Sequence, residues 1–228
     1  MNIAIIPARG GSKRIPRKNI KDFCGKPMIA WSIEAAKNSK LFDHIIVSTD
    51  DAEISEVAKA WGAEVPFMRP ESLSDDFVGT IDVVAHAVKW ALAEGLPLRA
   101  ICALYATAPF MQAGDLDRGL SCLNSGDWDY AFSVTNFNSS IFRSFAYSDG
   151  GVKMFFPEHF EKRSQDFPEA LHDAAQFYWG RPKSWIEKRN MFSKKSKPVM
   201  LPRWRVQDID TQEDWVRAEK LSPLIFNN

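Results

Sequence analysis

The sequence predicts an α/β protein with a mostly parallel sheet and helices on both of its faces. Short apolar runs alternate with amphipathic stretches over the first two-thirds of the chain, and the apolar runs are rich in β-branched residues. This β-α-β-α order is typical of a parallel, Rossmann-like sheet. The chain has 228 residues, which is enough for one domain with a substantial core.

The expected elements follow from hydrophobic period and end signals. Apolar or β-rich runs predict strands at 2–8, 43–49, 64–67, 99–105, 130–134 and 204–209. Amphipathic stretches predict helices at 27–39, 51–61, 79–94, 114–123 and 211–221. Asp50 and Glu53 offer a capping box for the second helix. Trp215, Ala218 and Leu221 share one face of the last helix, which we expect to pack on the sheet.

The alternation breaks at Asn136. From there to about Lys197 the chain is aromatic and rich in turn residues. We expect an irregular, β-rich lobe at about 136–197, inserted into a single domain that spans 1–228. Because so irregular a segment covers its own apolar surface poorly, we also expect a homodimer in which the lobe reaches the partner subunit.

Composition excludes several classes of protein. Lys+Arg and Asp+Glu both number 29, so the overall charge favours no nucleic acid or other polyanionic partner. The cysteines Cys24, Cys102 and Cys122 are widely spaced and form no C-x-x-C pair, which argues against a zinc site or a disulfide framework. No signal peptide and no apolar run of about 20 residues is present, so we expect a cytoplasmic protein outside the membrane.

A basic loop follows the first strand directly. Between Arg9 and Lys26 there are seven basic residues and one acidic residue, Asp22. The adjacent glycines Gly10 and Gly11 allow backbone dihedrals that are closed to other residues, so their amides could turn toward an anion. The spacing matches neither a dinucleotide fingerprint nor a P-loop. The loop predicts a triphosphate site, with a solvated basic loop or a nucleic-acid patch as the alternatives.

Several motifs then point to one family. The loop reads I-P-A-R-G-G-S-K at 6–13 and P-R-K-N-I at 16–20, and V-Q-D-I-D-T stands at 206–211. With these motifs the chain resembles the cytidylyltransferases that activate sialic acid and related nonulosonic acids. Y-A-T-A-P at 105–109 and H-D-A-A-Q-F-Y-W at 172–179 resemble most the branch that acts on pseudaminic acid.

The resemblance implies an activity and roles for particular residues. It implies transfer of CMP from CTP to the anomeric hydroxyl of the sugar, with Mg²⁺ as cofactor and pyrophosphate as the second product. Arg9 and Lys18 would act in catalysis. The residues expected to bind CTP are Ala8, Arg9, Gly10, Gly11, Ser12, Lys13, Lys18, Asn19 and Arg69. The residues expected to bind the sugar are Tyr105, Thr107, Arg163, Gln165, His172, Asp173 and Gln176.

Asp208 and Asp210 form a carboxylate pair. On a strand, two residues that are two apart point to the same face, and Mg²⁺ is commonly held by one or two carboxylates, waters and phosphate oxygens. The alternative is helix capping by Asp210 or Thr211. The resemblance assigns both carboxylates to the metal, and it leaves open whether one of them or a metal-bound water takes the proton of the attacking hydroxyl.

Other functions stay open from the sequence. The sugar could be sialic or legionaminic acid. Tyr105 and Ala108 stand where the sialic acid enzymes usually have polar residues, and the less polar surface suits pseudaminic acid, a 9-deoxy sugar with a second acylated amine; alternatively, Tyr105 only packs in the core. A non-catalytic nucleotide-binding module and a dehydrogenase are the candidates from other classes. The presence of Lys13, Asp208 and Asp210 argues against the non-catalytic module.

Overall fold

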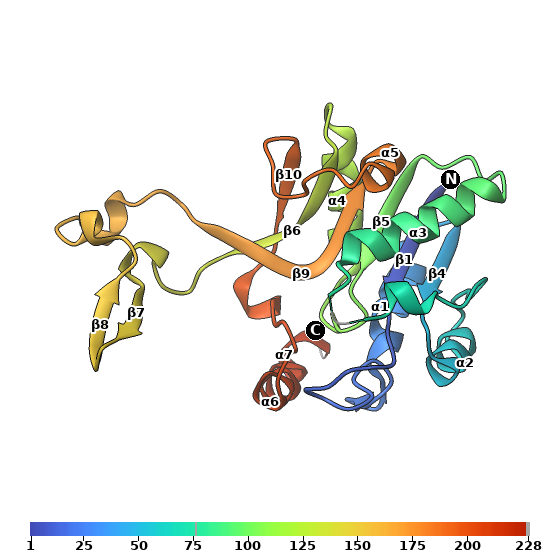
Figure 1. Ribbon diagram of the computed structural model, residues 1–228, viewed down its shortest axis with the longest axis horizontal. Helices are drawn as coiled ribbons and strands as arrows, with labels where there is room; N and C mark the ends of the chain where they lie inside the picture. Colours follow the sequence, from blue (N-terminus) through green and yellow to red (C-terminus); the bar gives the residue numbers. More distant parts are fainter. Residues whose placement is uncertain (76, 227–228) are drawn as a thin grey trace.

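The computed structural model describes residues 1–75 and 77–226, and it confirms the predicted α/β fold (Figure 1). A six-stranded sheet has the order β10-β6-β9-β5-β1-β4. Its strands are β1 (Asn2–Pro7), β4 (His44–Ser48), β5 (Ala100–Leu104), β6 (Tyr130–Asn136), β9 (Leu171–Gly180) and β10 (Ser196–Met200). Five of these strands point the same way, and β9 runs antiparallel to its neighbours β5 and β6.

Helices cover both faces of the sheet because alternate strand residues face opposite sides. On β1, Ala4 and Ile6 belong to one core cluster, and Ile3 and Ile5 belong to another. The first cluster is shared with α1 (Met28–Ser39), α2 (Ala52–Ala60) and α4 (Ala113–Asn124). The second is shared with α3 (Thr80–Ala93) and α5 (Pro182–Ile186).

A third core cluster lies beside the sheet. Phe23 packs edge-on against Trp215, with ring centroids 5.3 Å apart, and Phe110 and Ile15 belong to the same cluster. It joins the small hairpin β2 (Asp22–Phe23) and β3 (Lys26–Pro27) to α6 (Gln212–Leu221) and α7 (Pro223–Phe226). The apolar face of α6 therefore packs under the basic loop, and the expectation that it packs on the sheet is wrong.

The inserted lobe is shorter than the sequence predicts. Both β9 and β10 belong to the main sheet, so the projecting part is 137–170, which we call the arm (Figure 1). It carries the hairpin β7 (Phe145–Ser148) and β8 (Gly151–Met154). Within the described residues, short 3-10 turns occur at Glu71–Leu73, Ile141–Arg143, Pro157–His159, Ser164–Asp166 and Arg203–Arg205.

Two predicted strands are absent from the described residues. The stretch 64–67 makes only an isolated bridge between Glu64 and Ile46. The stretch 204–209 begins in a 3-10 turn and then runs without strand pairing. Its buried residues are held by side-chain contacts with other elements. In the sequence, residues buried in this way show the same pattern as residues of a paired strand.

The caps of the helices differ in part from expectation. Asp51, and not Asp50, caps α2 by accepting a hydrogen bond from the Ile54 amide at 2.9 Å. Thr211 caps α6 and forms a reciprocal capping box with Asp214. Since Thr211 fills this role, the side chain of Asp210 is not needed as the cap.

Candidate active site

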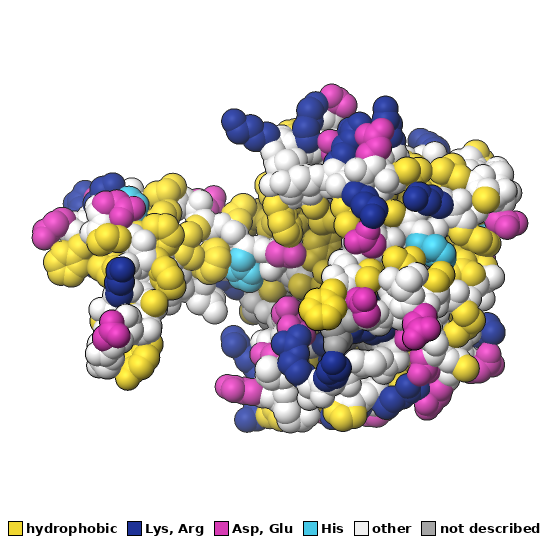
Figure 2. Space-filling model, viewed as in Figure 1, with side chains coloured by type: hydrophobic (Ala, Val, Ile, Leu, Met, Phe, Trp, Pro, Cys, Tyr) yellow, Lys and Arg dark blue, Asp and Glu magenta, His cyan; other side chains and the backbone are white. Residues whose placement is uncertain are grey.

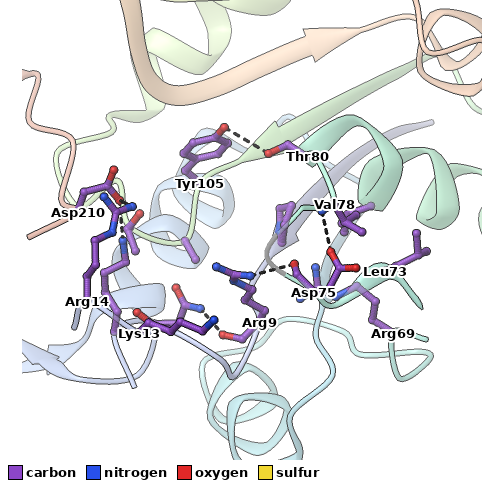
Figure 3. Close-up of a pocket in the computed structure, with 17 residues that line it drawn as sticks. Arg9, Lys13, Arg14, Arg69, Leu73, Asp75, Val78, Thr80, Tyr105 and Asp210 are labelled. Atoms are coloured by element: carbon purple, nitrogen blue, oxygen red, sulfur yellow. Dashed lines mark hydrogen bonds and ion pairs between the residues drawn. The ribbon is translucent and has the colours of Figure 1, made fainter. Parts of the chain in front are cut away.

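The main cavity lies beyond the carboxyl ends of β1 and β5, where open α/β sheets bind ligands. It has a volume of about 580 Å³. Figure 3 shows basic side chains of the loop after β1 entering it from one side, with Tyr105 and Thr80 on another. The residues that line it are Pro7, Arg9, Ser12, Lys13, Arg14, Lys18, Asn19, Arg69, Leu73, Asp75, Val78, Thr80, Val83, Tyr105, Ala106, Thr107 and Asp210.

Gly10 is needed for a close approach, and not for an unusual backbone dihedral. A Cβ on Gly10 would lie 2.6 Å from Oδ2 of Asp51, which no larger residue could tolerate without movement. Among the described residues with positive φ, neither Gly10 nor Gly11 is found. The amide of Gly10 donates to Oδ1 of Asp50 at 3.0 Å, so it is directed away from the anion that the sequence led us to expect.

The loop is held by carboxylates at the end of β4. Arg17, at φ 55°, donates to both oxygens of Asp51 at 2.5 and 3.0 Å. This bidentate pair, despite some burial, lowers the pKa of Asp51 to about 2. The Asn19 amide also donates to the carbonyl of Arg9 at 2.9 Å. These bonds fix the curvature of the loop before any ligand binds.

Basic side chains concentrate on this cavity. Arg9, Lys13, Arg14, Lys18 and Arg69 all line it. Arg69 is only 6% exposed, and its Nε and Nη2 atoms have no hydrogen-bond partner among the described residues. Its ion pair with Asp50, at 3.5 Å, is too long and poorly directed to satisfy them. Buried donors without partners are uncommon in folded proteins, so Arg69 is suited to a ligand acceptor.

Asp210 stands at the edge of the basic cluster. Its Oδ1 lies 2.9 Å from Nη2 of Arg14 and 3.3 Å from Nζ of Lys18. Lys18 also donates to the carbonyl of Ile209 at 2.5 Å. Lys18 therefore connects the loop to the segment that carries the carboxylate pair, even though the two lie at opposite ends of the chain.

Asp208 lies beside Asp210 in the same crevice. Part of the Asp208 surface is open, but nearby protein atoms displace water from its carboxylate. This desolvation is the larger cause of the raised pKa of Asp208, and repulsion from Asp210 is the second. Two neighbouring carboxylates whose charges disfavour each other fit a divalent cation that completes its shell with water and phosphate oxygens. Among the described residues, no group of three or more potential metal-ligating side chains occurs, so an all-protein metal cage is not formed there.

A second cavity, of about 430 Å³, adjoins the first. Asp210 lines both cavities, and Asp208 lines the second. The lining mixes cations, amides and carboxylates: Thr135, Asn136, Asn138, His172, Asp173, Arg203, Val206, Gln207, Asp208, Asp210, Asp214 and Arg217. A ligand with a carboxylate and many hydroxyl or amide groups matches this chemistry better than an apolar ligand does.

Two tyrosines connect the first cavity to Asp173 in the lining of the second. Tyr105 faces the first cavity and contacts the Thr80 hydroxyl at 3.3 Å. Its ring packs against that of Tyr178, with centroids 5.2 Å apart. The Tyr178 hydroxyl donates to Oδ2 of Asp173 at 2.6 Å. Burial, the neighbouring Tyr105 and Asp173 raise the pKa of Tyr178, so this phenol stays a hydrogen-bond donor.

Most of the predicted site residues line one of the two cavities, and two are buried in the core. Ser12, Lys13, Lys18, Asn19, Arg9, Arg69, Tyr105 and Thr107 line the first cavity, and His172, Asp173, Asp208 and Asp210 line the second. Ala8 is buried in the core, and its amide pairs with the Ser48 carbonyl. Gln176 is also buried, and its Nε2 donates to the Arg205 carbonyl at 2.8 Å.

Arg163 and Gln165 are exposed on the arm, and neither is among the described residues that line the two cavities. Arg163 is paired with Asp166, its Nε lying 3.0 Å from Oδ2. Within one chain, these two predicted sugar-binding residues therefore remain apart from the other predicted site residues.

Sequence reasoning missed several lining residues. Arg14 could have been predicted, because it belongs to the same basic run as Lys13. The residues missed in the second cavity come from β6, the segment after it, the stretch 203–207 and α6, so no local pattern groups them. They include Thr135, Asn136, Asn138, Arg203, Gln207 and Arg217.

Comparisons with known proteins agree with this geometry. The pseudaminic acid cytidylyltransferase of Campylobacter jejuni subsp. jejuni serotype O:23/36 (strain 81-176) is 44% identical over 214 residues, which is 93% of this chain and 92% of the relative. N-acylneuraminate cytidylyltransferase A of Danio rerio is 34% identical over 95% of this chain and 50% of the relative.

A solved structure of CMP:2-keto-3-deoxy-manno-octonic acid synthetase complexed with CTP has the same fold, with a TM-score of 0.69, 16% identity and 98% coverage of both chains. A family model described as cytidylyltransferase matches residues 3–221. With this match over nearly the whole chain, and with the relatives above, the protein belongs to the cytidylyltransferase family.

Proposed function

We propose that the protein transfers CMP from CTP to the anomeric hydroxyl of pseudaminic acid and releases pyrophosphate. The observation that carries this proposal is the meeting of two unlike cavities at Asp210, one lined with basic side chains and one with mixed polar groups. A reaction between a triphosphate and an acidic sugar needs two such sites with a shared border. The similarity to a protein named for pseudaminic acid supports the choice of sugar.

The first cavity is the proposed CTP site. Arg9, Ser12, Lys13 and Lys18 would contact the triphosphate, whose negative charge the basic cluster offsets. Asn19 and Arg69 would lie toward the ribose and cytosine. The unpartnered nitrogens of buried Arg69 support a role in which a ligand oxygen accepts from them. Because the amide of Gly10 donates to Asp50, only the amide of Gly11, of the two glycines, could face the phosphates.

The second cavity is the proposed sugar site. Arg203, Arg217 and His172 offer positive or hydrogen-bonding groups for the sugar carboxylate, and Asp173 offers an acceptor whose position is set by Tyr178. Tyr105 and Thr107 would meet the sugar from the nucleotide side. Gln176 would act on the sugar site only indirectly, because its side chain is buried against the Arg205 carbonyl.

In the proposed reaction, the anomeric hydroxyl gives its proton to a carboxylate of the pair or to a water, and its oxygen forms a bond to the α-phosphorus in line with the departing oxygen. The bond between that phosphorus and the oxygen of the β-phosphate breaks. Lys18 and Arg9 stabilise the charge that collects on pyrophosphate, an electrostatic role. Asp208 and Asp210 would hold Mg²⁺, which when bound neutralises phosphate charge and polarises the reacting centre. Lys18 also orients Asp210 through its ion pair and its bond to Ile209.

The proposal includes a homodimer. Figure 2 shows hydrophobic side chains on the surface of the arm. Five large apolar side chains of the arm are more than half exposed: Phe145, Tyr147, Val152, Phe155 and Phe160. A second subunit that covers them would also give Arg163 and Gln165 a route to a sugar site, across the subunit boundary.

We also propose a cytoplasmic location. All three cysteines are free thiols, as is usual in a reducing compartment. None of the helices in the described part of the chain has the length and apolar character that a membrane-spanning helix needs.

The test is pyrophosphate release measured with each of the four ribonucleoside triphosphates, crossed with pseudaminic, sialic and legionaminic acids. We expect release with CTP and pseudaminic acid, and its loss when EDTA removes Mg²⁺. Equal or better catalytic efficiency with sialic acid would overturn the choice of sugar. Binding of CTP without release from any sugar would instead support a non-catalytic nucleotide-binding module.

A further inference from the structure

The carboxylate pair lies on a segment with no secondary structure of its own. Between the turn Arg203–Arg205 and the start of α6 the described chain makes no strand pairing. Two side chains bound to one cation must nevertheless keep their separation, because Mg²⁺ tolerates little departure from octahedral geometry. The segment must therefore be held from outside, at both of its ends.

The downstream end is held by the α6 cap. Oδ2 of Asp214 accepts from the amide of Thr211 at 2.8 Å and from the amide of Asp210 at 3.2 Å. Ile209, between the two carboxylates, is fully buried in the third core cluster. These contacts fix the backbone of Asp210, and the side-chain amide of Gln207 donates to the carbonyl of Asp208 at 2.8 Å. The residues before Gln207 must be fixed from the other side.

The upstream end is held by a buried ion pair. Arg205 donates to both oxygens of Asp115 on α4, at 2.5 and 3.1 Å, and these side chains are only 7% and 5% exposed. Gln176 of β9 donates to the carbonyl of the same Arg205 at 2.8 Å. The side chain and the main chain of Arg205 are thus bound to two different elements of the sheet domain.

We infer that Asp115, Arg205 and Gln176 are positioning residues for the metal site, acting through the backbone that carries Asp208. This inference rests on the proposed metal role of Asp208 and Asp210. A buried ion pair is a weak source of net stability, because desolvation offsets much of its attraction. Its bidentate geometry, however, sets an orientation, and here it orients the three residues that precede Asp208.

The test separates positioning from stability by replacing the pair with apolar residues. The double variant Asp115→Leu with Arg205→Met keeps a buried contact of similar size, and such replacements are often neutral or stabilising for the fold. We expect a thermal midpoint near that of the wild type. Mn²⁺ titrated into each protein, with free Mn²⁺ followed by EPR, should bind about 10-fold more weakly to the double variant, as is common when groups that orient metal ligands are removed.

Arg118→Met is the matched control. Arg118 also binds Asp115, at 2.6 Å, but it is half exposed and its other contact is the Met200 carbonyl, upstream of Arg205. We expect wild-type Mn²⁺ affinity in this variant. If the double variant were poorly folded, Arg205→Lys would keep a cation beside Asp115 without the two-pronged bond, and its Mn²⁺ affinity should lie between those of the wild type and Asp208→Asn.

The outcomes are distinct. Wild-type Mn²⁺ affinity in the double variant, or in Arg205→Lys if that is the folded one, together with weak binding by Asp208→Asn, would overturn the positioning role and leave the metal site standing. Wild-type affinity in Asp208→Asn itself would overturn the metal site, and the positioning role with it. Weaker Mn²⁺ binding in a stably folded double variant, with Arg118→Met unchanged, is the result that the inference requires.

Discussion

Lys18 connects the basic loop to the carboxylate pair, and its removal gives the sharpest test of the proposed CTP site. Its Nζ lies 3.3 Å from Oδ1 of Asp210, with the two side chains 16% and 41% exposed. At this separation opposite charges attract by about 1 kcal/mol in water and about 5 kcal/mol at an effective dielectric constant near 20. Because Asp210 is well solvated, the larger figure overstates the attraction. For the free energy lost when Lys18 is removed we take the range for one hydrogen bond to a charged group, about 1.5–3 kcal/mol.

We therefore expect Lys18→Met to lower kcat/KM for CTP by roughly 10- to 150-fold, with a much smaller effect on the KM for the sugar. Steady-state pyrophosphate release, with CTP varied at saturating sugar and then the reverse, measures both. Lys21→Met is the matched control, since Lys21 belongs to the same loop but lies over the Trp215 ring, 4.5 Å from its centroid. A wild-type kcat/KM for CTP in Lys18→Met, or an effect confined to the sugar, would refute the assignment.

The same variant has a predicted pH dependence. The charge of Lys18 lowers the pKa of Asp208, against the burial and the Asp210 repulsion that raise it. Without Lys18 the pKa of Asp208 rises further, so at a given pH more of the carboxylate is protonated and unable to hold Mg²⁺. The acid limb of the pH–rate profile should move to higher pH. An unmoved acid limb would contradict the proposed coupling between Lys18 and Asp208.

Three further predictions concern the metal, the sugar and the assembly. Asp208→Asn and Asp210→Asn should each lose most turnover, measured at limiting Mg²⁺. Normal turnover in both variants would contradict the metal assignment. Asp208→Asn should also keep or raise the thermal midpoint at neutral pH, because folding raises the pKa of Asp208 and a carboxylate with a raised pKa destabilises the fold above that pKa. Tyr105→Gln should narrow the preference for pseudaminic over sialic acid, since it puts an amide where an aromatic ring now faces the cavity; an unchanged ratio of kcat/KM values would mean that Tyr105 only packs. Sedimentation velocity at micromolar concentration should show a dimer, because the arm exposes side chains such as Tyr147, 83% accessible; a monomer would count against the dimer.

The hydrophobic period of the sequence was sufficient to predict fully buried strands and amphipathic helices. The buried runs at β1, β4, β5 and β6 and the amphipathic helices between them were predicted in the right order. The strand β9 was missed because His172 and Asp173 near its start and Gln176 in its second half are polar, and these residues hide a strand that is buried in the middle of the sheet. Its partners lie far away in the sequence, so no local pattern announces the pairing.

The strand predicted at 204–209 was wrong for the opposite reason. Trp204, Val206 and Ile209 give it a strand-like composition, yet it is held by contacts with other elements, notably the Arg205–Asp115 ion pair. That ion pair joins residues 90 positions apart, and nothing in either local sequence identifies the other partner. The strand expected for Asp208 and Asp210 was wrong, although both residues were expected to lie together.

The two halves of the candidate site differ in the same way. The first cavity takes most of its basic side chains from one continuous loop, so these residues could be listed from a motif before the structure was known. The second cavity collects residues from β6, β9, the turn at Arg203–Arg205 and α6. Arg217, for example, is an ordinary exposed helix residue by pattern. Such a composite site is visible only once the fold has brought its parts together.

³¹P NMR of the reaction mixture shows whether this crevice transfers CMP from CTP to a nonulosonic acid, because it follows the substrate and both products at once. With CTP, Mg²⁺ and pseudaminic acid, the three triphosphate signals should be replaced by one phosphodiester signal of the CMP-sugar and one pyrophosphate signal, in equal molar amounts of product. Formation of CDP and inorganic phosphate, or an unchanged CTP spectrum with all of the nonulosonic acids, would contradict the proposed CMP transfer.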